Sequence, residues 1–553
     1  MCGLIVASNI SKIDSGLLAH RGPDEFYEYI LGQQKFAFFR LAITGGFEGS
    51  SPILSADKKW QIFLNGEIYN FKSLINSYNL PYSNSDSQVL IDGVAKYGVG
   101  FIGKARGMFA GFIVSLESKK VYCFRDPLGE KPLFSGSLNG EIYFSSEVTA
   151  LAKIMSTQLT IDSFSVANYF QLGYIEEPRT IFKEIKSVDR GVIFEIDFAL
   201  LKLNKIATID ITNYPENHLD FSDLMETVVK EQSYYSGDAS ILLSSGVDSS
   251  TLFKMLSKYR TRITPYVYAE ATNRNEIEWI KALIFSLGNG YPAKITLPPF
   301  AHTSFLNQML EVSIIFDQPH SDSASFAYLN LIKKMHKANL RVMYVGHGPD
   351  EFFWGYSPVL ELYNSIGTNL RKKTRYYWDT PANCKQITSA INSEFMDLSN
   401  FSLEYSDPYL DSDVTSQKLK AEVVHSYLAH NGLRQIDRLA MSHSIEPRNP
   451  FADSRIYAWS QFNDIKPKMN QDKYFFRKFS SSIVSPRVAY RTKKGFSTST
   501  LWKFKDESWD ASSALDFLYS LEIPWQKKLQ SSELDTRTKF RLYNIFTWIK
   551  FHF

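Results

Sequence analysis

Residues 241–250 of this chain are Ile-Leu-Leu-Ser-Ser-Gly-Val-Asp-Ser-Ser. The apolar triplet is typical of a buried parallel strand, and an amphipathic helical pattern begins directly afterwards at Thr251. A loop of small residues between a strand and a helix is where α/β sheets bind phosphate, because backbone N–H groups can approach the anion closely. The hydroxyl groups of Ser244, Ser249 and Ser250 add donors. A serine-capped helix, the alternative, accounts for one serine but not for the whole run.

Asp248 stands inside this loop. A carboxylate placed beside a phosphate would repel it, so Asp248 makes chemical sense as a ligand of Mg²⁺ bound next to the phosphate. We therefore predict a magnesium and phosphate site at the end of this strand.

Strand and helix patterns alternate on both sides of the loop. This alternation is the signature of a parallel sheet with helices on both faces. From about residue 361 the pattern is mainly helical with long loops. The expected strands are 239–243, 265–269, 295–297 and 342–345, and the expected helices are 249–256, 276–287 and 326–336.

The chain before residue 155 has a different rhythm, with short apolar runs separated by turn signals. It is expected to be a sheet-rich domain of two packed layers with helices outside. Residues 158–214 look transitional. The expected strands are 4–8, 36–43, 61–64, 109–115, 121–125 and 142–144, with a helix at 87–97. The turn signals are Gly45-Gly46, Asn65-Gly66, Asp126-Pro127 and Asn139-Gly140.

Cys2 follows Met1 directly. Removal of Met1 would leave Cys2 with a thiol and a free α-amino group, whose pKa of about 7.7–8 allows it to act as a base near neutral pH. A terminal residue whose own amine activates its side chain is a known nucleophile arrangement. An ordinary surface thiol is the alternative, and it would be preferred if Cys2 stood alone.

Composition excludes several classes of protein. The 553 residues suffice for two or three domains, and a net charge of +3 gives no reason to invoke nucleic acid or an anionic membrane. Three widely spaced cysteines predict neither a disulfide framework nor a zinc site, so a reducing cytoplasm is the expected location. No apolar run approaches a membrane span, and 3–8 is too short for a signal peptide.

Together, Cys2 and the serine-rich loop resemble the glutamine-dependent asparagine synthetase family, followed through nearly the whole chain to about Phe496. The resemblance implies an N-terminal-nucleophile (αββα) glutaminase domain at 1–157, a connection at 158–214 and an α/β ATP-pyrophosphatase-like synthetase domain with a helical C-terminal part at 215–553. The matching motifs include Arg21-Gly22-Pro23-Asp24, Arg40-Leu41-Ala42-Ile43, Asn65-Gly66-Glu67-Ile68-Tyr69-Asn70, Ser85-Asp86-Ser87, Ser145-Ser146-Glu147 and the stretch from Asp437 to Asp453.

The resemblance assigns a glutamine site to the first domain. Cys2 would attack the glutamine amide, release ammonia and form a thioester that water hydrolyses. Arg40 can hold the glutamine carboxylate bidentately. Asn65 and the Gly66 N–H would form the oxyanion hole. Glu67 and Asp86 would pair with the glutamine ammonium. Taken alone, Asn65-Gly66 would be the turn of a hairpin; within the ordered set the catalytic role is favoured.

The second domain is similarly expected to bind ATP with Mg²⁺. Val345-Gly346-His347-Gly348-Pro349-Asp350-Glu351 resembles a second family loop, in which Asp350 would join Asp248 on the metal. By register with the family, Lys493 would stabilise charge on the α-phosphate during adenylation, and Tyr268 ends a strand expected to contact adenine. The ATP-binding set is completed by Leu243, Ser244, Ser245, Gly246, Ser249, Gly346 and His347.

Two departures bear on the acceptor. Ser245 replaces the first Gly of the usual Ser-Gly-Gly-x-Asp-Ser loop, and serine tolerates positive φ poorly, so a slightly reshaped loop is expected. His347 replaces an acidic residue suited to hold the ammonium of aspartate or incoming ammonia; neutral imidazole could accept a proton instead. Aspartate and a sugar acid or other metabolite carboxylate therefore both stay open as acceptors.

Two further alternatives concern the whole protein. A cyclase or ligase using an amine of its own substrate would not need Cys2, Arg40, Asn65 and Asp86. A catalytically inactive regulatory protein would need neither set of residues. The expected partners are glutamine, ATP and an acceptor carboxylate, with no nucleic acid or membrane; a homodimer is common in the family.

Overall fold

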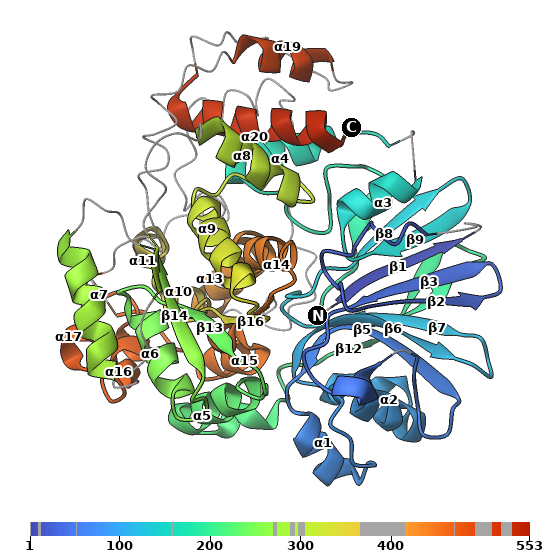
Figure 1. The fold of residues 1–553 in the computed structure, drawn as a ribbon, viewed down its shortest axis with the longest axis horizontal. Helices are drawn as coiled ribbons and strands as arrows, with labels where there is room; N and C mark the ends of the chain where they lie inside the picture. The colour runs from blue at the N-terminus through green and yellow to red at the C-terminus, as the bar shows by residue number, and fades with distance from the viewer. Residues whose placement is uncertain are drawn as a thin grey trace.

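The computed structural model shows two parts lying side by side, a pair of antiparallel sheets and a parallel sheet surrounded by helices (Figure 1). No helix of the described chain is long and apolar enough to cross a membrane. The structure describes residues 2–8, 13–50, 52–155, 159–268, 274–287, 294–296, 305–364, 415–468, 471–492, 511–520 and 534–552.

The first part contains two six-stranded antiparallel sheets. In order across the first sheet, the strands are β10 (Ile185–Ser187), β8 (Phe134–Leu138), β9 (Glu141–Ser145), β1 (Cys2–Ser8), β3 (Gln34–Arg40) and β2 (Glu25–Leu31). Across the second they are β12 (Lys202–Thr208), β11 (Val192–Asp197), β7 (Val121–Arg125), β6 (Gly107–Ser115), β5 (Trp60–Ile68) and β4 (Ile53–Leu54).

The two sheets pack face to face through an aromatic core. Phe36 of the first sheet stacks on Phe63 of the second, with ring centroids 5.3 Å apart, and Phe112 meets Phe36 edge-on. The outer faces are covered by helices: α1 (Phe71–Tyr78) and α2 (Asp86–Tyr97) on the second sheet, α3 (Val148–Met155) and α4 (Ser163–Leu172) on the first. These layers are the αββα arrangement expected from the sequence, which is confirmed.

The sequence predictions differ from the structure of the first part in several places, including β2 and β8, which were not among the expected strands. Asn65 and Gly66 form no turn: both lie inside β5, where they pair with Ala110 and Phe109 of β6. The stretch 158–214, expected to be a connection, instead supplies β10 to one sheet and β11 and β12 to the other. These strands lack alternation strong enough to identify them alone. β10 pairs with β8, β11 pairs with β7, and β12 pairs with β11 at the edge of the sheet. We propose that the first domain extends to about Thr208.

The second part is built on a five-stranded sheet in which every neighbouring pair is parallel. The order is β15 (Lys294–Thr296), β14 (Ile263–Tyr268), β13 (Ala239–Leu242), β16 (Val342–Tyr344) and β17 (Glu446–Arg448). The parallel sheet predicted from the sequence is confirmed. The edge strand β17 was not predicted, because its three residues include a proline and two charges.

Helices surround this sheet and continue to the C-terminal end (Figure 1). Those between the strands are α5 (Phe221–Gln232), α6 (Val247–Leu256), α7 (Arg274–Leu287), α8 (Phe305–Ile315), α9 (Ala324–Lys337), α10 (Pro349–Phe352), α11 (Ser357–Asn364), α13 (Thr415–Val423), the π-helix η7 (Val424–Leu433) and α14 (Arg434–Met441). After β17 come α15 (Ser454–Phe462), α16 (Tyr474–Ser480), α17 (Pro486–Ala489), α19 (Ser512–Ser520) and α20 (Thr536–His552). Short 3-10 turns are η1 (Gly46–Gly49), η2 (Val99–Lys104), η3 (Pro215–His218) and η8 (Pro450–Ala452).

The strand order places a topological switch between β13 and β16. From β13 the chain proceeds outward to β14 and β15, and it later returns to add β16 and β17 on the other side. Loops at the carboxyl ends of strands diverge at such a point and leave a crevice that binds ligands. The serine-rich loop follows β13 and the Gly346–Asp350 loop follows β16, so both predicted nucleotide loops lie there.

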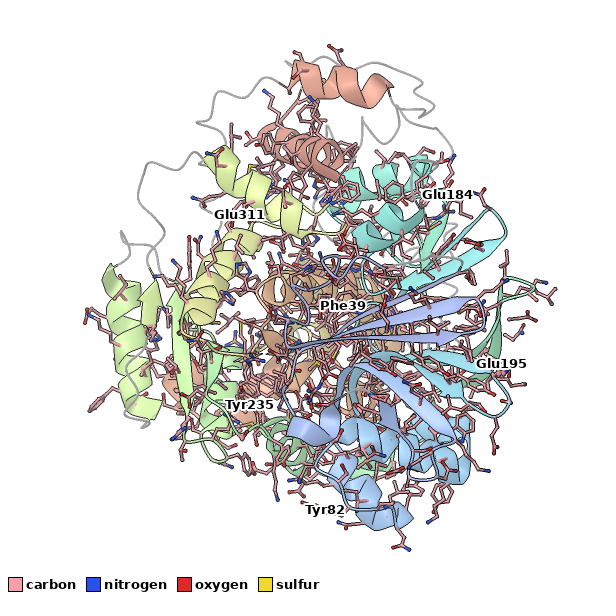
Figure 2. All side chains as sticks on the ribbon, turned by 45° about the vertical axis from the view of Figure 1, so that its right-hand side comes forward. Phe39, Tyr82, Glu184, Glu195, Tyr235 and Glu311 are labelled. Carbon is pink, nitrogen blue, oxygen red and sulfur yellow. The ribbon has the colours of Figure 1, made fainter. Side chains whose placement is uncertain are left out.

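The two parts share a packed interface. The fully buried Trp548 of α20 donates its indole N–H to Phe316 O at 2.9 Å, and its ring contacts Phe182 of the first part. Phe39, on the first sheet, lies deep in the molecule, whereas Tyr82 and Glu311 mark its margins (Figure 2). The sites on either side therefore belong to one continuous body.

Candidate functional site

Cys2 begins β1 and is buried opposite Arg40 of β3. Its backbone N–H donates to Asn65 Oδ1 at 3.0 Å, and this bond joins the start of β1 in the first sheet to β5 in the second. Asn65 is fully buried, and its Nδ2 has no hydrogen-bond partner within the described residues. An amide donor kept unpaired next to a thiol is suited to receive a developing oxyanion.

Gly66 allows the neighbouring strands β5 and β6 of the second sheet to approach closely. It has φ +143°, and a Cβ at this position would lie 2.0 Å from Met108 O of β6. Only glycine fits this place. The predicted oxyanion residues are thus held by a strand conformation and not by a hairpin turn.

Burial and the groups around Cys2 act in opposite directions on the pKa of its thiol. Burial raises the pKa of the Cys2 thiol, while the positive chain terminus, a backbone hydrogen bond at Leu41 and the Arg40 guanidinium lower it. The thiol is protonated at neutral pH in this setting and needs a base to act as a nucleophile.

The other predicted glutamine-binding residues line the surrounding strands and loops. Arg40 donates to Gly46 O at 2.7 Å, which fixes its guanidinium beside η1. Asp86, at the start of α2, accepts the Ile68 N–H at 2.7 Å, and burial raises its pKa.

Glu67 lies next to Asp86 and connects to the second part. Its carboxylate accepts the Thr44 hydroxyl at 3.2 Å. Burial and the carboxylates of Glu446 and Asp86 raise its pKa well above the usual range. Two neighbouring buried carboxylates with raised pKa values would gain from a bound ammonium.

The serine-rich loop is internally cross-linked. Ser249 accepts the Ser244 N–H at 3.0 Å, the two hydroxyls lie 2.9 Å apart, and Gly246 donates its N–H to Ser244 Oγ at 3.1 Å. Gly246 has φ −80°, and the backbone of Ser245 does not have a positive φ. The backbone of this loop therefore accepts a serine at position 245 without strain.

The two predicted metal ligands are brought together by a lysine that the sequence did not single out. Buried Lys473 contacts Asp248 Oδ2 at 2.6 Å and Asp350 Oδ1 at 2.9 Å. Burial alone would lower the pKa of Lys473, but both carboxylates raise it above its usual range. Paired carboxylates at a phosphate loop fit Mg²⁺, which binds through one or two carboxylates and substrate phosphates. No motif spacing marks Lys473, since it joins its partners only in three dimensions.

The structure describes three of the remaining residues predicted for this site, Gly346, Tyr268 and Leu243. Gly346 lies against the start of α6, where an added Cβ would meet Ser249 N at 3.2 Å. Tyr268 ends β14, and Leu243 donates its N–H to Tyr266 O at 2.9 Å. Lys493 lies outside the described residues.

His347 lies beside Tyr328, and the charge of Asp350 acts on it. Its Nε2 lies 3.3 Å from the Tyr328 hydroxyl. Burial lowers the pKa of His347 to about 4 against the opposing charges of Asp350 and Asp322, so the imidazole is neutral at pH 7. The His347 ring can therefore act as a hydrogen-bond donor or acceptor but not as a cation.

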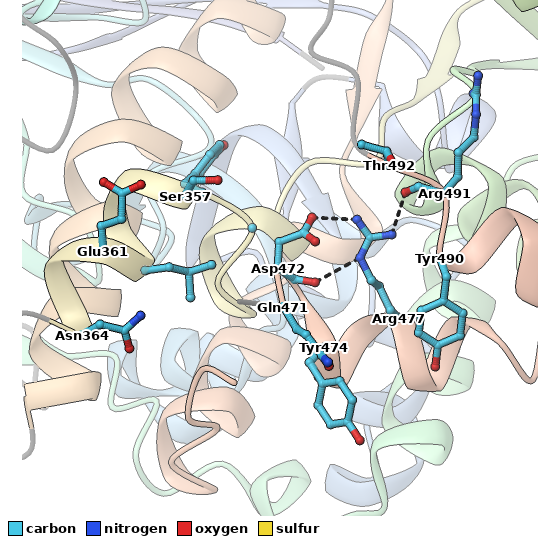
Figure 3. Close-up of a pocket in the computed structure, with 13 residues that line it drawn as sticks. Ser357, Glu361, Asn364, Gln471, Asp472, Tyr474, Arg477, Tyr490, Arg491 and Thr492 are labelled. Atoms are coloured by element: carbon cyan, nitrogen blue, oxygen red, sulfur yellow. Dashed lines mark hydrogen bonds and ion pairs between the residues drawn. The ribbon is translucent and has the colours of Figure 1, made fainter. Parts of the chain in front are cut away.

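A cavity of about 940 Å³ lies between the segment 355–364 and the segment 471–492 (Figure 3). Tyr356 and Glu361 line one wall, and Asp472, Arg477 and Arg491 line another. Arg477 is engaged by Asp472 at 2.6 Å, as Figure 3 shows, and Arg491 donates to Ser245 O at 3.3 Å. Arg491 thus connects the wall of the cavity to the phosphate loop.

Strand β17 links the two sites. Arg448 lies 2.6 Å from Glu446 on the same strand and 3.7 Å from Glu67 of the glutamine pocket. Glu446 is fully buried and contributes a negative potential at Cys2. An edge strand of the parallel sheet therefore lies against the residues predicted to bind glutamine.

Comparison with known proteins gives matches for both parts. A family model described as a glutamine amidotransferase domain matches residues 1–205, and one described as asparagine synthase matches residues 220–514. Glutamine-hydrolyzing asparagine synthetase 1 of Bacillus subtilis is 26% identical over 529 residues, covering 87% of this chain and 82% of that protein. Glutamine-hydrolyzing asparagine synthetase 2 of the same organism is 25% identical over 570 residues, covering 90% and 72%.

Proposed function

Because this chain belongs to the asparagine synthase family, we propose that it hydrolyses glutamine at Cys2 and uses MgATP to activate a carboxylate, which the released ammonia converts to an amide. The observation that carries this proposal is a contact between the two parts: Arg448 of the parallel sheet lies 3.7 Å from Glu67, one of the residues predicted to bind glutamine. A glutaminase and a nucleotide site joined in this way are suited to pass ammonia from one to the other.

In the first half-reaction, once Met1 has been removed, the free α-amine of Cys2 takes the thiol proton as sulfur attacks the glutamine amide carbon. Asn65 Nδ2 and the Gly66 N–H receive the negative charge that develops on the carbonyl oxygen. Collapse of the intermediate expels ammonia and leaves a thioester, which water hydrolyses to glutamate. Arg40, Glu67 and Asp86 hold the glutamine carboxylate and ammonium.

In the second half-reaction, the acceptor carboxylate attacks the α-phosphorus of ATP and pyrophosphate leaves. A carboxylate oxygen is a poor leaving group, and its conversion to an acyl-adenylate makes AMP the group that ammonia displaces. Asp248 and Asp350 would hold Mg²⁺, which neutralises phosphate charge when bound. Lys473, and Lys493 by family register, would supply further positive charge at the phosphates.

Aspartate is the acceptor that the family relationship favours, and a sugar acid is the second candidate because His347 stands in place of an acid. A ligase that uses an amine of its own substrate is less well supported, since the residues around Cys2 form a complete set: an unpaired buried amide, a facing arginine and two buried carboxylates.

The test combines product analysis with one substitution. Purified protein is mixed with glutamine, MgATP and aspartate, and glutamate, asparagine, AMP and pyrophosphate are quantified by mass spectrometry. Asparagine matched by AMP is the expected result. Cys2→Ala should abolish glutamine use but leave ammonia use. Unchanged glutamine-dependent synthesis by the variant would refute the role of Cys2, and no AMP with any acceptor would refute the ligase.

A further inference from the structure

The C-terminal helix α20 lies across the boundary between the two parts. Figure 1 shows it next to α4 of the first part and α8 of the second, and both helices contact it. The asparagine synthase model ends at residue 514, so α20, which begins at Thr536, lies beyond the matched region. This chain therefore joins its two parts with an element that the family model does not include.

The side chains of α20 enter two hydrophobic cores. Leu542, Ile545 and Trp548 belong to the core beneath α3 and α4 of the first part. Phe540 and Tyr543 belong to the core beneath α8 and α9 of the second part. Because apolar area would be exposed on both sides if the parts moved apart, a helix placed in this way resists a change in their relative position.

Hydrogen bonds also fix α20 to both parts. On the first part, the Tyr169 hydroxyl donates to Arg541 O at 2.9 Å, and Arg541 Nη1 donates to Phe170 O at 2.5 Å. On the second part, the Trp548 indole N–H donates to Phe316 O at 2.9 Å. Phe170 O and Phe316 O are backbone carbonyls, so α20 holds the main chain of both parts.

The carbonyl bound by α20 begins a segment, residues 316–321, that leads to the synthetase site. Ser321 of this segment donates its N–H to Gly173 O of the first part at 2.9 Å. Helix α9 follows, and its Tyr328 hydroxyl lies 3.3 Å from His347 Nε2 in the loop after β16. The position of the segment therefore affects where the synthetase site lies relative to the first part.

The side chains of the segment do not hold it in place by themselves. Gln318 Oε1 accepts the Ile181 N–H at 3.0 Å. However, Gln318 Nε2 and His320 Nε2 are buried and have no hydrogen-bond partner among the described residues. Buried polar atoms are rarely left unpaired, so a segment that keeps two of them depends on contacts with its surroundings. Trp548 supplies such a contact at the first residue of the segment.

We propose that Trp548 of α20 is a positioning residue for nitrogen transfer, which holds the two parts in the arrangement that lets ammonia pass directly from Cys2 to the activated carboxylate. This inference rests on the proposed function, because the arrangement matters only if both half-reactions occur. Each half-reaction by itself uses the residues of its own part. Loss of the Trp548 contact should therefore release ammonia into solution while both half-reactions continue.

The test measures where the nitrogen of the product comes from. The protein is given glutamine with isotopically labelled amide nitrogen, an equal concentration of unlabelled ammonium chloride, MgATP, and either aspartate or gluconate as a sugar acid. Mass spectrometry then gives the labelled fraction of the amide product. In wild type this fraction should stay close to that of the glutamine amide.

Two substitutions weaken the contact to different degrees. Trp548→Phe keeps an aromatic ring and removes the indole N–H, so the labelled fraction should fall toward that of the free ammonium. Trp548→Ala also removes the ring from both neighbouring elements, and the fraction should fall further. Glutamate formation and synthesis from ammonium alone should both persist in Trp548→Phe, which separates lost transfer from lost catalysis.

Trp459→Phe is the matched control. Trp459 is buried and donates its indole N–H to Leu219 O at 2.9 Å, but both residues belong to the second part. This variant loses the same kind of hydrogen bond without affecting the boundary between the parts. It should keep the wild-type labelled fraction even if it unfolds at a lower temperature.

The outcomes separate the inference from the proposed function. An unchanged labelled fraction in both Trp548 variants, or an equal fall in Trp459→Phe, would overturn the inference alone. If Trp548→Ala does not fold, the result for Trp548→Phe decides. A wild-type product that already matches the free ammonium would overturn direct passage and the inference but not the ligase. No amide with either acceptor would overturn the proposed function, and the inference with it.

Discussion

Lys473 Nζ lies 2.6 Å from Asp248 Oδ2, which ties the segment before α16 to the loop after β13. The same ammonium contacts Asp350 at 2.9 Å, so one cation balances two carboxylates at the predicted metal position. The lysine charge keeps the two carboxylates from repelling each other. If the two aspartates hold Mg²⁺ beside ATP as proposed, the same ammonium would supply positive charge at the phosphates.

Lys473→Met should therefore lower both the rate of pyrophosphate release and the unfolding temperature, which are measured separately. Pyrophosphate release should fall by about 10²-fold or more, because a preorganised charge beside the phosphates is lost. The unfolding temperature should also fall, since Asp248 and Asp350 lose their counter-charge. Mg²⁺ should raise the unfolding temperature of this variant more than that of wild type, as measured by differential scanning fluorimetry. An equal response to Mg²⁺ in both proteins would contradict the assignment of the two aspartates to the metal.

Asn65→Ala should damage only the glutaminase. The change removes the free Nδ2 donor and the acceptor that holds the Cys2 N–H at 3.0 Å. Loss of one oxyanion donor costs about 10²–10³ in kcat. Glutamate formation should fall by this factor, whereas amide synthesis from ammonium salts should be unchanged. A comparable loss with ammonia would mean that Asn65 supports the interface and not the oxyanion.

The contrast between Asp248 and Lys473 shows how much of the site the sequence predicts. Asp248 sits in a strand–loop–helix pattern whose local chemistry is visible in ten consecutive residues, and the parallel sheet was predicted from the same pattern. Lys473 reaches Asp248 across 225 positions, so no local period or spacing marks it. Strands β10 and β11 were missed for the same reason, since their partners β8 and β7 lie far away in the sequence. Asn65-Gly66 shows a further limit: a dipeptide typical of turns is accommodated in a strand where the neighbouring strand comes unusually close.

Gly66→Ala tests that close approach. The new Cβ would lie 2.0 Å from Met108 O, and the backbone at φ +143° is strained for alanine. We expect β5 and β6 to separate locally, with a lower unfolding temperature and loss of glutamine hydrolysis. Gly103→Ala is a suitable control, because nothing lies within 4 Å of a Cβ at that position. Full glutaminase activity in Gly66→Ala would contradict the role of this strand geometry in the oxyanion site.

Glu177 offers a test of the interface through pH. Its carboxylate pairs with Arg125 at 2.9 Å, Arg190 at 2.9 Å and Arg434 of α14 at 2.6 Å. Burial raises the pKa of Glu177, but the guanidinium groups of Arg125 and Arg190 outweigh it and hold the pKa well below the usual range. Ionised Glu177 thus joins the first part of the chain to the second.

Glu177→Gln should leave three buried guanidinium groups without this counter-charge. Breaking a buried ion pair costs about 3–5 kcal/mol, so the first unfolding transition should occur at a clearly lower temperature at pH 7. A folded-state pKa below the unfolded value of about 4.3 stabilises the protein above that pH, and the contribution is lost as pH falls through the folded-state pKa. The difference in unfolding temperature between wild type and variant, measured by calorimetry, should stay constant from pH 8 to about 5 and become smaller below about pH 4. A gap that widens at low pH would show that Glu177 is not held ionised by its arginines.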